Sequence, residues 1–353
     1  MKNRVKSFIK KKYKHILIGV VITFVTLIIV IISGFFVIKF SGQKSLNKDA
    51  IVEGKAVDGT SIDSVIKYKG KSYKYKDGII NILCLGIDKS SDMTLSENPG
   101  YMGQSDAIFL VSIDTKNDAV SIIAIPRDTM LPVQIYNADN QYYNMKTMQI
   151  AVQYAFGNNS ERSAELTTKA ISGLLYNIPI QRYCAVNLNT VSILNDAVGG
   201  VKVTIENDFT DEQVAVVDKD FVKGNTVTLN GEQALKFIQE RDCSLFASSM
   251  DRLSRQSMYI DSFMEIAQKA IKKNVFIPIH VYNKIRKNNY ISTDIKGSEA
   301  TYLATKMLDI TIRSDDIVTV PGEVKTGEVY EEYNVNNEAL KEIIMDTFYA
   351  KVN

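Results

Sequence analysis

The chain is poor in the residues on which several common kinds of site depend. Its three cysteines, Cys84, Cys184 and Cys243, are far apart and form no CxxC pair. An odd number of cysteines at such spacings predicts neither a zinc site nor a disulfide framework, so we interpret them as buried thiols. The two histidines, His15 and His280, lack a partner motif, which argues against a nucleophile activated by histidine.

A general excess of positive charge is also absent. The formal net charge is +2, but residues 1–15 contain no acidic residue and seven basic ones, which are Lys2, Arg4, Lys6, Lys10, Lys11, Lys12 and Lys14. The rest of the chain carries 35 basic against 40 acidic residues. Because nucleic-acid binding depends on neutralising phosphates with Lys and Arg, we expect no nucleic-acid partner.

A long apolar run follows the basic residues. Residues 16–38 contain no charged side chain, and a helix of this length would be roughly 35 Å long, enough to cross a membrane. The positive-inside rule places residues 1–15 in the cytoplasm as a basic tail and the remainder outside the cell. No small-residue cleavage site follows the run, so we predict a retained signal anchor and a single-pass protein of the cell membrane.

Residues 39–78 are polar and predict an extracellular stalk with an accessory hairpin. The hairpin is expected within Ser64–Tyr75, with its turn at Lys69-Gly70. Its lysines are interpreted as a solvated strand face.

Residues 79–273 have the pattern of an α/β core. Three apolar strands, IINILCLGID, SDAIFLVSID and AVSIIAIPRD, are followed by alternating helices and strands. The helices are predicted at Met145–Phe156, Glu161–Leu175, Thr190–Ala197, Glu232–Ile238 and Asp251–Ile271, and the strands at Gln181–Leu188 and Val201–Glu206. This alternation favours an α/β/α sandwich with a mixed central sheet. Residues 274–353, with a last helix near Glu338–Tyr349, would complete the core or pack on it.

Charged residues gather at the ends of the first three strands. Asp88 ends the first, Asp106 begins the second and Arg127 ends the third. If neighbouring strands are antiparallel, these three side chains meet at one edge of the sheet. Two carboxylates and a guanidinium at a rigid edge indicate a site for a metal ion and phosphate.

The long helix predicted over Asp251–Ile271 begins with Arg252, Arg255 and Gln256, which share one side of its first turns. Arginines at a helix N-terminus oppose the macrodipole unless an anion binds there. Two interpretations remain open at this point. The arginines either bind an anionic ligand or form a surface salt-bridge cluster with Asp251 and Glu265.

Several motifs in order carry a resemblance to a known family. LGID, SDAIFLVSID, IPRD, LNDAVGGV, LNGEQALKFIQER and DRLSRQ, spread over Ile79–Ile271, resemble the LytR–CpsA–Psr family. The resemblance implies an extracellular phosphotransferase that takes an anionic glycopolymer (wall teichoic acid, capsule or a related polysaccharide) from a polyprenyl-pyrophosphate carrier. The acceptor would be peptidoglycan. The resemblance also implies an apolar tunnel for the lipid and Mg²⁺ or a similar divalent cation as cofactor.

The same resemblance implies roles for particular residues. Asp88 and Asp106 match the family's acidic positions and would bind the metal ion. Arg127, Arg241 and Arg252 match arginines that would clamp the pyrophosphate, and Gln256 matches the family residue that accompanies Arg252 on the long helix. We expect the acids and the three arginines to be catalytic.

Two positions depart from the family pattern. Gln104 and Gln239 stand where the family usually has arginine, so the pyrophosphate site has fewer cations. By the same resemblance, Gln104, Gln239 and Gln256 are expected to bind the pyrophosphate together with the three arginines. Two alternatives therefore stay open beside the transferase. One is a polyprenyl-pyrophosphate hydrolase that uses water as acceptor, and the other is a membrane-anchored protein that binds lipid-linked glycan or wall without catalysis.

Overall fold

The computed structural model describes residues 33–47, 50, 53–206, 209, 219–310 and 316–352. The predicted basic tail and residues 16–32 of the predicted anchor lie outside these ranges. No helix among the described residues is both long and apolar enough to span a membrane. Residues 39–46, expected to belong to the stalk, continue a helix that the structure shows over residues 33–46.

The described residues divide into two compact units. The smaller one consists of residues up to 45 together with Lys296–Thr305, so it contains most of helix α8 (Gly297–Asp309). Within it, a Cβ atom placed on Gly42 would lie 2.1 Å from the carbonyl oxygen of Ser298, which explains why a glycine is needed there. The larger unit, from Leu46 to Ile295 and from Lys306 onward, contains the candidate site.

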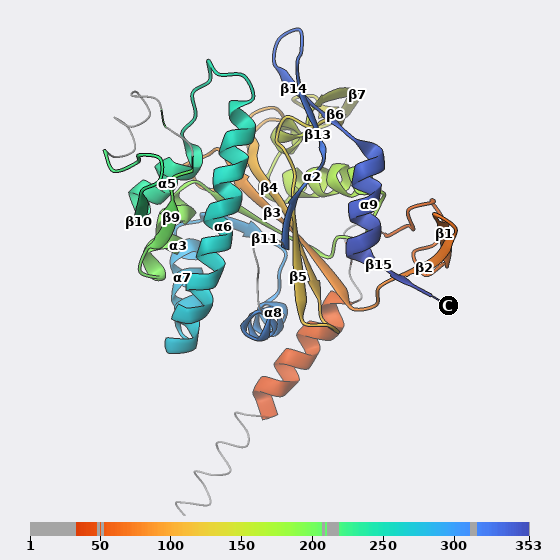
Figure 1. Cartoon of the computed structure of the whole chain (residues 1–353), viewed down its shortest axis with the longest axis horizontal. Helices are drawn as coiled ribbons and strands as arrows, with labels where there is room; N and C mark the ends of the chain where they lie inside the picture. Colours follow the sequence, from red (N-terminus) through yellow and green to blue (C-terminus); the bar gives the residue numbers. More distant parts are fainter. Residues whose placement is uncertain are drawn as a thin grey trace, which may run out of the picture. The chain divides into compact units, whose positions relative to one another are not determined.

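A six-stranded mixed sheet forms the centre of the larger unit, in the order β11-β8-β3-β4-β5-β12 (Figure 1). The strands are β3 (Ile79–Ile87), β4 (Ser105–Asp114), β5 (Ala119–Ala124), β8 (Arg182–Asn187), β11 (Ile291–Thr293) and β12 (Ile317–Thr319). The first three pair antiparallel, as predicted. β8 joins β3 in parallel and β12 joins β5 in parallel, while β11 is antiparallel to β8. The predicted mixed α/β architecture is confirmed.

Helices lie on both sides of this sheet. Leu83, Leu85 and Ile87 of β3 belong to the main core, which also includes residues of the 3-10 helix η1 (Ile150–Phe156), α2 (Ser160–Leu174) and α9 (Asn337–Phe348). Because side chains alternate along a strand, Cys84 points to the other side, where it lines a cavity together with residues of α3 (Asn189–Ala197) and α6 (Ser248–Lys273). Figure 1 shows β3, β4 and β5 between α6 on one side and α2 and α9 on the other.

A smaller apolar cluster fixes the position of α6. It joins β9 (Val201–Thr204), β10 (Thr226–Leu229) and α5 (Gly231–Gln239) to Tyr259 of α6. Asn230 and Gln233 form a reciprocal capping box at the start of α5, which satisfies two backbone N–H groups that the first turn leaves without partners. The end of α5 and the start of α6 are thereby held against each other.

Most of the predicted elements are confirmed, and one helix is wrong. The hairpin around Lys69-Gly70 is formed by β1 (Ile66–Tyr68) and β2 (Lys71–Tyr75), and β15 (Tyr349–Lys351) adds a third strand. The predicted helix Met145–Phe156 is helical only from Ile150, as η1. Its first five residues belong to β7 (Tyr142–Gln149), which pairs with β6 (Met130–Tyr136). Apolar residues three apart suit a helix, but cross-strand pairing with β6 decides the conformation here.

The cysteine prediction is also corrected in part. Cys84 and Cys184 are half-buried free thiols on neighbouring strands and line a cavity. Burial raises the pKa of the Cys184 thiol to about 11. Cys243 is exposed rather than buried, because it lies in the polar loop between α5 and α6.

Candidate active site

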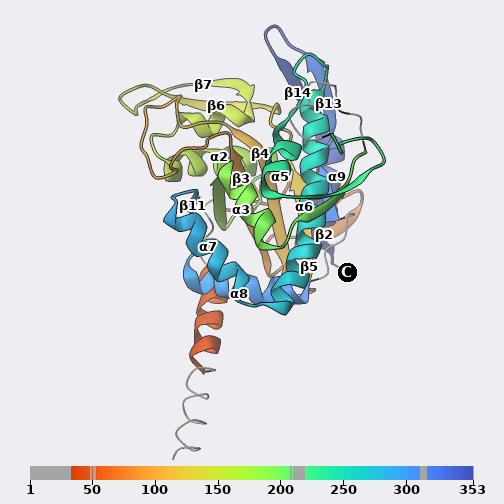
Figure 2. The ribbon, with the colours of Figure 1, turned by 90° about the vertical axis from the view of Figure 1, so that its left-hand side faces the viewer.

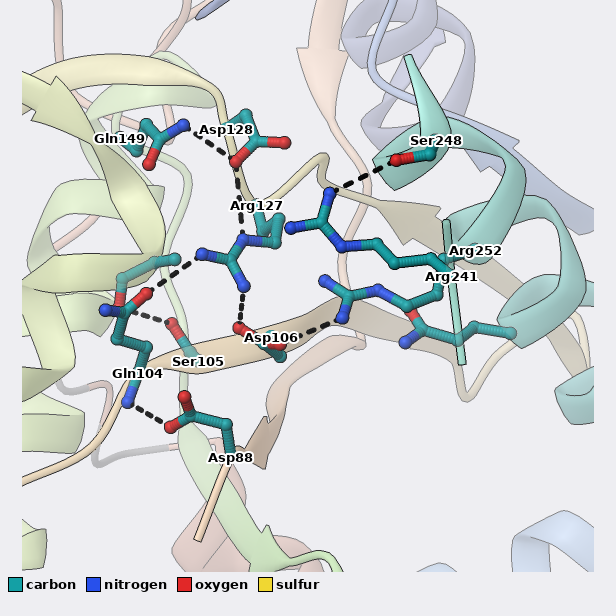
Figure 3. A network of polar contacts seen from close by, with 12 residues as sticks. Asp88, Gln104, Ser105, Asp106, Arg127, Asp128, Gln149, Arg241, Ser248 and Arg252 are labelled. Carbon is teal, nitrogen blue, oxygen red and sulfur yellow. Dashed lines mark hydrogen bonds and ion pairs between the residues drawn. The ribbon is translucent and has the colours of Figure 1, made fainter. Parts of the chain in front are cut away.

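The antiparallel pairing of β3, β4 and β5 brings the three predicted charged residues to one edge of the sheet. Arg127, just beyond β5, forms an ion pair with Asp106 at the start of β4 (Figure 3). Its Nη2 donates to Oε1 of Gln104 over 2.9 Å, and its Nε lies 3.3 Å from Oδ1 of Asp128. The guanidinium is thus held in one orientation by three neighbours.

Arg252 reaches the same carboxylate from the first turns of α6. Its Nη1 donates to Oδ2 of Asp106 over 3.0 Å, while Arg127 occupies Oδ1. The Arg252 side chain is only 7% exposed, and its Nη2 is buried with no hydrogen-bond partner among the described residues. A buried, unsatisfied charged donor is costly, so this atom is suited to receive an oxygen of an anionic ligand.

Arg241, beyond the end of α5, completes a group of three arginines. Its Nη1 donates to Oγ of Ser248 at the start of α6 over 3.4 Å. Burial is the main cause that lowers the pKa of Arg252, and the positive charges of Arg127 and Arg241 lower it further. The three arginines therefore lie close together, and Asp106 accepts from two of them, with one carboxylate oxygen for Arg127 and the other for Arg252.

The salt-bridge interpretation of the α6 arginines is wrong. Arg252 pairs with Asp106 rather than with Asp251 or Glu265, and Glu265 pairs with Lys269. Arg255 has a structural role: its Nε donates to the carbonyl of Phe237 over 3.0 Å and its Nη2 donates to the carbonyl of Glu240. It thereby satisfies carbonyl groups at the end of α5 that have no partner within that helix.

Asp88 lies directly after β3 and faces the same edge. Its Oδ1 accepts from the backbone N–H of Gln104 over 2.6 Å. Burial raises the pKa of Asp88, and the charge of Asp106 raises it further, against the lowering effect of the Gln104 N–H. Gly103 permits this approach, because it has a φ of +90° and an added Cβ would lie 3.3 Å from the Asp88 carboxylate.

The three glutamines predicted to bind pyrophosphate, Gln104, Gln239 and Gln256, have different surroundings in the structure. Gln104 accepts a hydrogen bond from Arg127 and so orients it. Gln256 donates from Nε2 to the carbonyl of Ile238 over 3.2 Å, which ties α6 to the end of α5. Gln239 and Gln256 both line the cavity described below. The predicted contact of Gln239 and Gln256 with pyrophosphate stays a prediction.

Sequence reasoning missed a second layer of supporting residues. Gln149 of β7 donates from Nε2 to Oδ1 of Asp128 and to the carbonyl of Glu331, over 2.9 and 2.8 Å. The Glu331 carboxylate accepts from the backbone N–H of Ala247 over 2.8 Å, immediately before α6. Ala247 has a φ of +60°, a conformation that costs energy for alanine. Asp128 is adjacent to Arg127 in the motif, but nothing local in the sequence indicates Glu331.

An apolar cavity of about 390 Å³ opens from this polar group. Its polar lining residues include Asp88, Asp106, Asn187, Gln239, Arg252 and Gln256. Most of its walls are apolar residues of β3, β4, β5, β8, α3 and α6. Along α6, Arg252 and Gln256 come first, followed by Tyr259, Ile260, Phe263 and Met264. One end of the cavity is therefore charged and the rest is apolar, as the family resemblance implies for a lipid tunnel.

The two acids fit a divalent cation only together with a ligand. No group of three or more His, Cys, Asp or Glu side chains suited to a metal occurs among the described residues. Mg²⁺ in proteins is commonly held by one or two carboxylates together with substrate phosphates and waters. Asp88, whose pKa is raised by burial and by Asp106, would be stabilised in its charged form by such a cation. Asp88 and Asp106 therefore suit an ion whose remaining ligands come from phosphate and water.

The fold and the site define an α/β protein that joins a cluster of arginines to an apolar cavity, an arrangement suited to a phosphate group on an apolar chain. The chain matches the model of the LytR_cpsA_psr family over residues 35–347. It belongs to this family, and the resemblance seen in the sequence motifs is confirmed.

Similar curated proteins carry cell-wall names. The polyisoprenyl-teichoic acid–peptidoglycan teichoic acid transferase TagU of Bacillus cereus (strain AH820) is 30% identical over 162 residues, which cover 46% of this chain and 44% of TagU. The cell wall biosynthesis protein LcpA of Corynebacterium glutamicum is 27% identical over 285 residues, covering 72% of this chain and 50% of LcpA. The chain thus spans about half the length or less of these curated relatives.

Solved structures show the same fold. The crystal structure of B. subtilis TagV has a TM-score of 0.57 and 21% identity, with 77% of this chain and 98% of that chain covered. Protein gbs0355 from Streptococcus agalactiae has a TM-score of 0.58 and 21% identity, with 76% and 87% covered.

Proposed function

We propose that this protein is a phosphotransferase that moves an anionic glycopolymer from a polyprenyl-pyrophosphate carrier to peptidoglycan. The observation that carries the proposal is that Arg252 lines one end of an apolar cavity of about 390 Å³ and that Arg127 and Arg241 lie close enough to lower its pKa. The charged end suits the pyrophosphate and the apolar walls suit the polyprenyl chain. The names of the relatives TagU and LcpA support teichoic acid or a related wall polymer as the cargo.

We place the catalytic unit outside the cell, held at the membrane by residues 16–38. The uncharged run of these residues and the basic residues before it support this placement. A carrier embedded in a bilayer would then remain within reach of the cavity.

The arginines would act on the charge of the pyrophosphate. Phosphoryl transfer asks the protein mainly for positioning and charge neutralisation, and guanidinium groups match phosphate oxygens in bidentate geometry. Arg252 offers its buried Nη2, which has no hydrogen-bond partner in the part of the chain that the structure describes, and Arg127 is kept in place by Gln104. A divalent cation such as Mg²⁺, held by Asp88 and Asp106, would neutralise further negative charge as the leaving group departs.

Asp88 would either share the cation or, where Asp106 holds the cation without it, take the proton of the acceptor hydroxyl. Its pKa is raised by burial and by Asp106, which makes it a stronger base than an ordinary aspartate. In the proposed step the acceptor hydroxyl oxygen forms a bond to the phosphorus nearest the sugar. The bond from that phosphorus to the bridging oxygen breaks, polyprenyl phosphate leaves, and the hydroxyl proton passes to Asp88.

The test uses the full chain in vesicles, with a synthetic polyprenyl-pyrophosphate glycan, peptidoglycan oligomers and Mg²⁺. Mass spectrometry follows the movement of phosphoglycan to the acceptor. Arg127→Ala is expected to abolish transfer, while Arg162→Ala, at a surface arginine paired with Glu165, keeps it. Release of polyprenyl phosphate without transfer would favour the hydrolase instead. Donor binding with no turnover would favour the non-catalytic alternative, which the glutamines at positions 104 and 239 support.

A further inference from the structure

The corner between α6 and α7 (Ile277–Lys287) exposes a row of apolar side chains. Val275, Phe276, Ile279 and Tyr282 are 60%, 60%, 55% and 41% exposed. Phe276 is the N-cap residue of α7, and Ile279 and Tyr282 follow at steps of three residues, so these three share one side of the helix, with Val275 directly before them. The exposed row ends one turn later at Ile285, which is buried and packs α7 against its neighbours, α3 and α6. An exposed apolar row of this kind marks an interaction surface.

The same corner is strongly basic. Residues 266–293 contain no Asp or Glu and six basic residues, which are Lys269, Lys272, Lys273, Lys284, Arg286 and Lys287. Lys269 pairs with Glu265, and the other five are exposed. This concentration is unusual in a chain whose residues after position 15 carry more acidic than basic side chains. The corner therefore attracts anions as well as apolar groups.

We propose that the α6–α7 corner binds the surface of a bilayer that contains anionic lipid. Interfacial segments combine a face of aromatic and aliphatic residues with flanking Lys and Arg, as this corner does. A water-dissolved polyanion would use the lysines but leave the apolar row exposed. A second copy of the chain would bring two basic surfaces together. Among the possible occupants, a bilayer surface alone satisfies both features without further assumptions about a partner.

The position of the corner relative to the cavity suggests that membrane contact would help the lipid-linked donor to enter the cavity. This part of the inference rests on the proposed function. α6 carries Arg252 near its start, lines the cavity with Tyr259 and Phe263, and ends at Lys273 beside the corner. At 1.5 Å per residue, Arg252 and Lys273 are about 30 Å apart along the helix. Figure 2 shows α6 running down to the corner, where α7 turns back. A bilayer at the corner would thus face the end of α6 that is remote from the charged site, the direction from which a polyprenyl chain would arrive.

The test exploits the absence of tryptophan from the chain. Phe276→Trp places a single fluorophore in the corner, where 60% exposure allows the larger ring without repacking. The matched control is Val329→Trp, 75% exposed in the turn between β13 (Gly322–Thr326) and β14 (Glu331–Val335). Each full-length variant is reconstituted in vesicles of phosphatidylglycerol and phosphatidylcholine, with and without brominated acyl chains.

The Phe276→Trp emission is expected to shift to the blue and to be quenched at least two-fold by brominated lipid, while the control stays unquenched. Replacing Lys272, Lys273, Lys284 and Lys287 by Gln should reduce this quenching, as should pure phosphatidylcholine. Equal emission and quenching at positions 276 and 329 would overturn the proposal, and so would quenching that does not change when the lysines are removed. The measurement needs no turnover, so Arg127→Ala is expected to keep the quenching. A failure of the membrane-binding proposal can therefore be told apart from a failure of the proposed transferase.

Discussion

Arg252 and Asp106 are 146 residues apart in the chain and are joined by a hydrogen bond of 3.0 Å between Nη1 and Oδ2. This contact ties the first turns of α6 to the start of β4. Because the other oxygen of Asp106 is paired with Arg127, one carboxylate compensates two largely buried cations. Arg252, which lines the cavity, and Arg127, which shares its carboxylate partner, are therefore held in place before any phosphate arrives.

The Asp106→Asn variant tests this compensation. We expect the free energy of unfolding to fall by about 3–5 kcal/mol, because removing one partner leaves buried charges uncompensated. Thermal and chemical unfolding of the full chain in detergent measures the change. Inorganic pyrophosphate should restore part of the loss by supplying the missing negative charge. Asp118→Asn, which breaks the more exposed pair with Lys306, should cost no more than about 1 kcal/mol. Equal losses in the two variants would contradict the role given to Asp106.

The Arg127→Lys variant tests whether the geometry of the guanidinium matters beyond its charge. Lysine cannot keep the contacts with Asp106, Gln104 and Asp128 together, because it is a point charge. We expect the transfer rate to fall about 100-fold, in line with the loss of one preorganised electrostatic donor. The initial rate of glycopolymer transfer measures it, and Arg162→Lys serves as the control. A wild-type rate in Arg127→Lys would show that charge alone is sufficient.

The Gln104→Arg variant restores the cation that the family usually has at this position. It removes the acceptor that now orients Arg127 but adds positive charge where the pyrophosphate is proposed to bind. We expect the KM for the lipid-linked donor to fall about 3- to 10-fold, with a smaller change in kcat. Titration of the donor in the transfer assay separates the two. A higher KM would mean that the contact between Gln104 and Arg127 is worth more than the added charge.

The stability of Asp88→Asn should depend on pH in a specific direction. The pKa of Asp88 is raised above its ordinary value of 3.8 by burial and by Asp106, so the folded chain binds this proton more tightly than the unfolded chain. Ionisation of Asp88 therefore lowers the free energy of unfolding, a cost that is absent below pH 3.8 and complete above the raised pKa. The variant should be more stable than the wild type at neutral pH and similar below pH 3.8. Unfolding measured from acidic to neutral pH tests this, and an advantage confined to acidic pH would refute it.

The Arg255→Met variant separates the structural arginine of α6 from the catalytic ones. Its loss removes the donors to the carbonyls of Phe237 and Glu240, so we expect the free energy of unfolding to fall by about 2–4 kcal/mol. Transfer should fall as well, because Arg241 extends from the same end of α5. Arg255→Lys should recover part of the stability. A stable variant with normal transfer would show that Arg255 is not needed to hold the end of α5 against α6.

Much of the sheet could be predicted because the local sequence pattern of its strands indicates their conformation. The apolar runs of β3, β4 and β5 and the short polar turn between the last two leave little choice of pairing. That pairing places Asp88, Asp106 and Arg127 at one edge without further information. The hairpin of β6 and β7 could not be predicted in the same way, because Met145 and Met148 fit a helix as well as a strand and only their partner strand decides between them.

The sequence by itself determined the family, the mixed α/β architecture and the charged residues of the site, because these depend on local patterns and on motifs in order. Only the tertiary structure decided that Arg252 compensates Asp106 whereas Arg255 holds the end of α5, although both are arginines three residues apart on one helix. It also placed Glu331 beside Ala247, 84 residues away in sequence. Such contacts join distant segments whose approach is fixed by packing of the whole sheet, so no local pattern carries them.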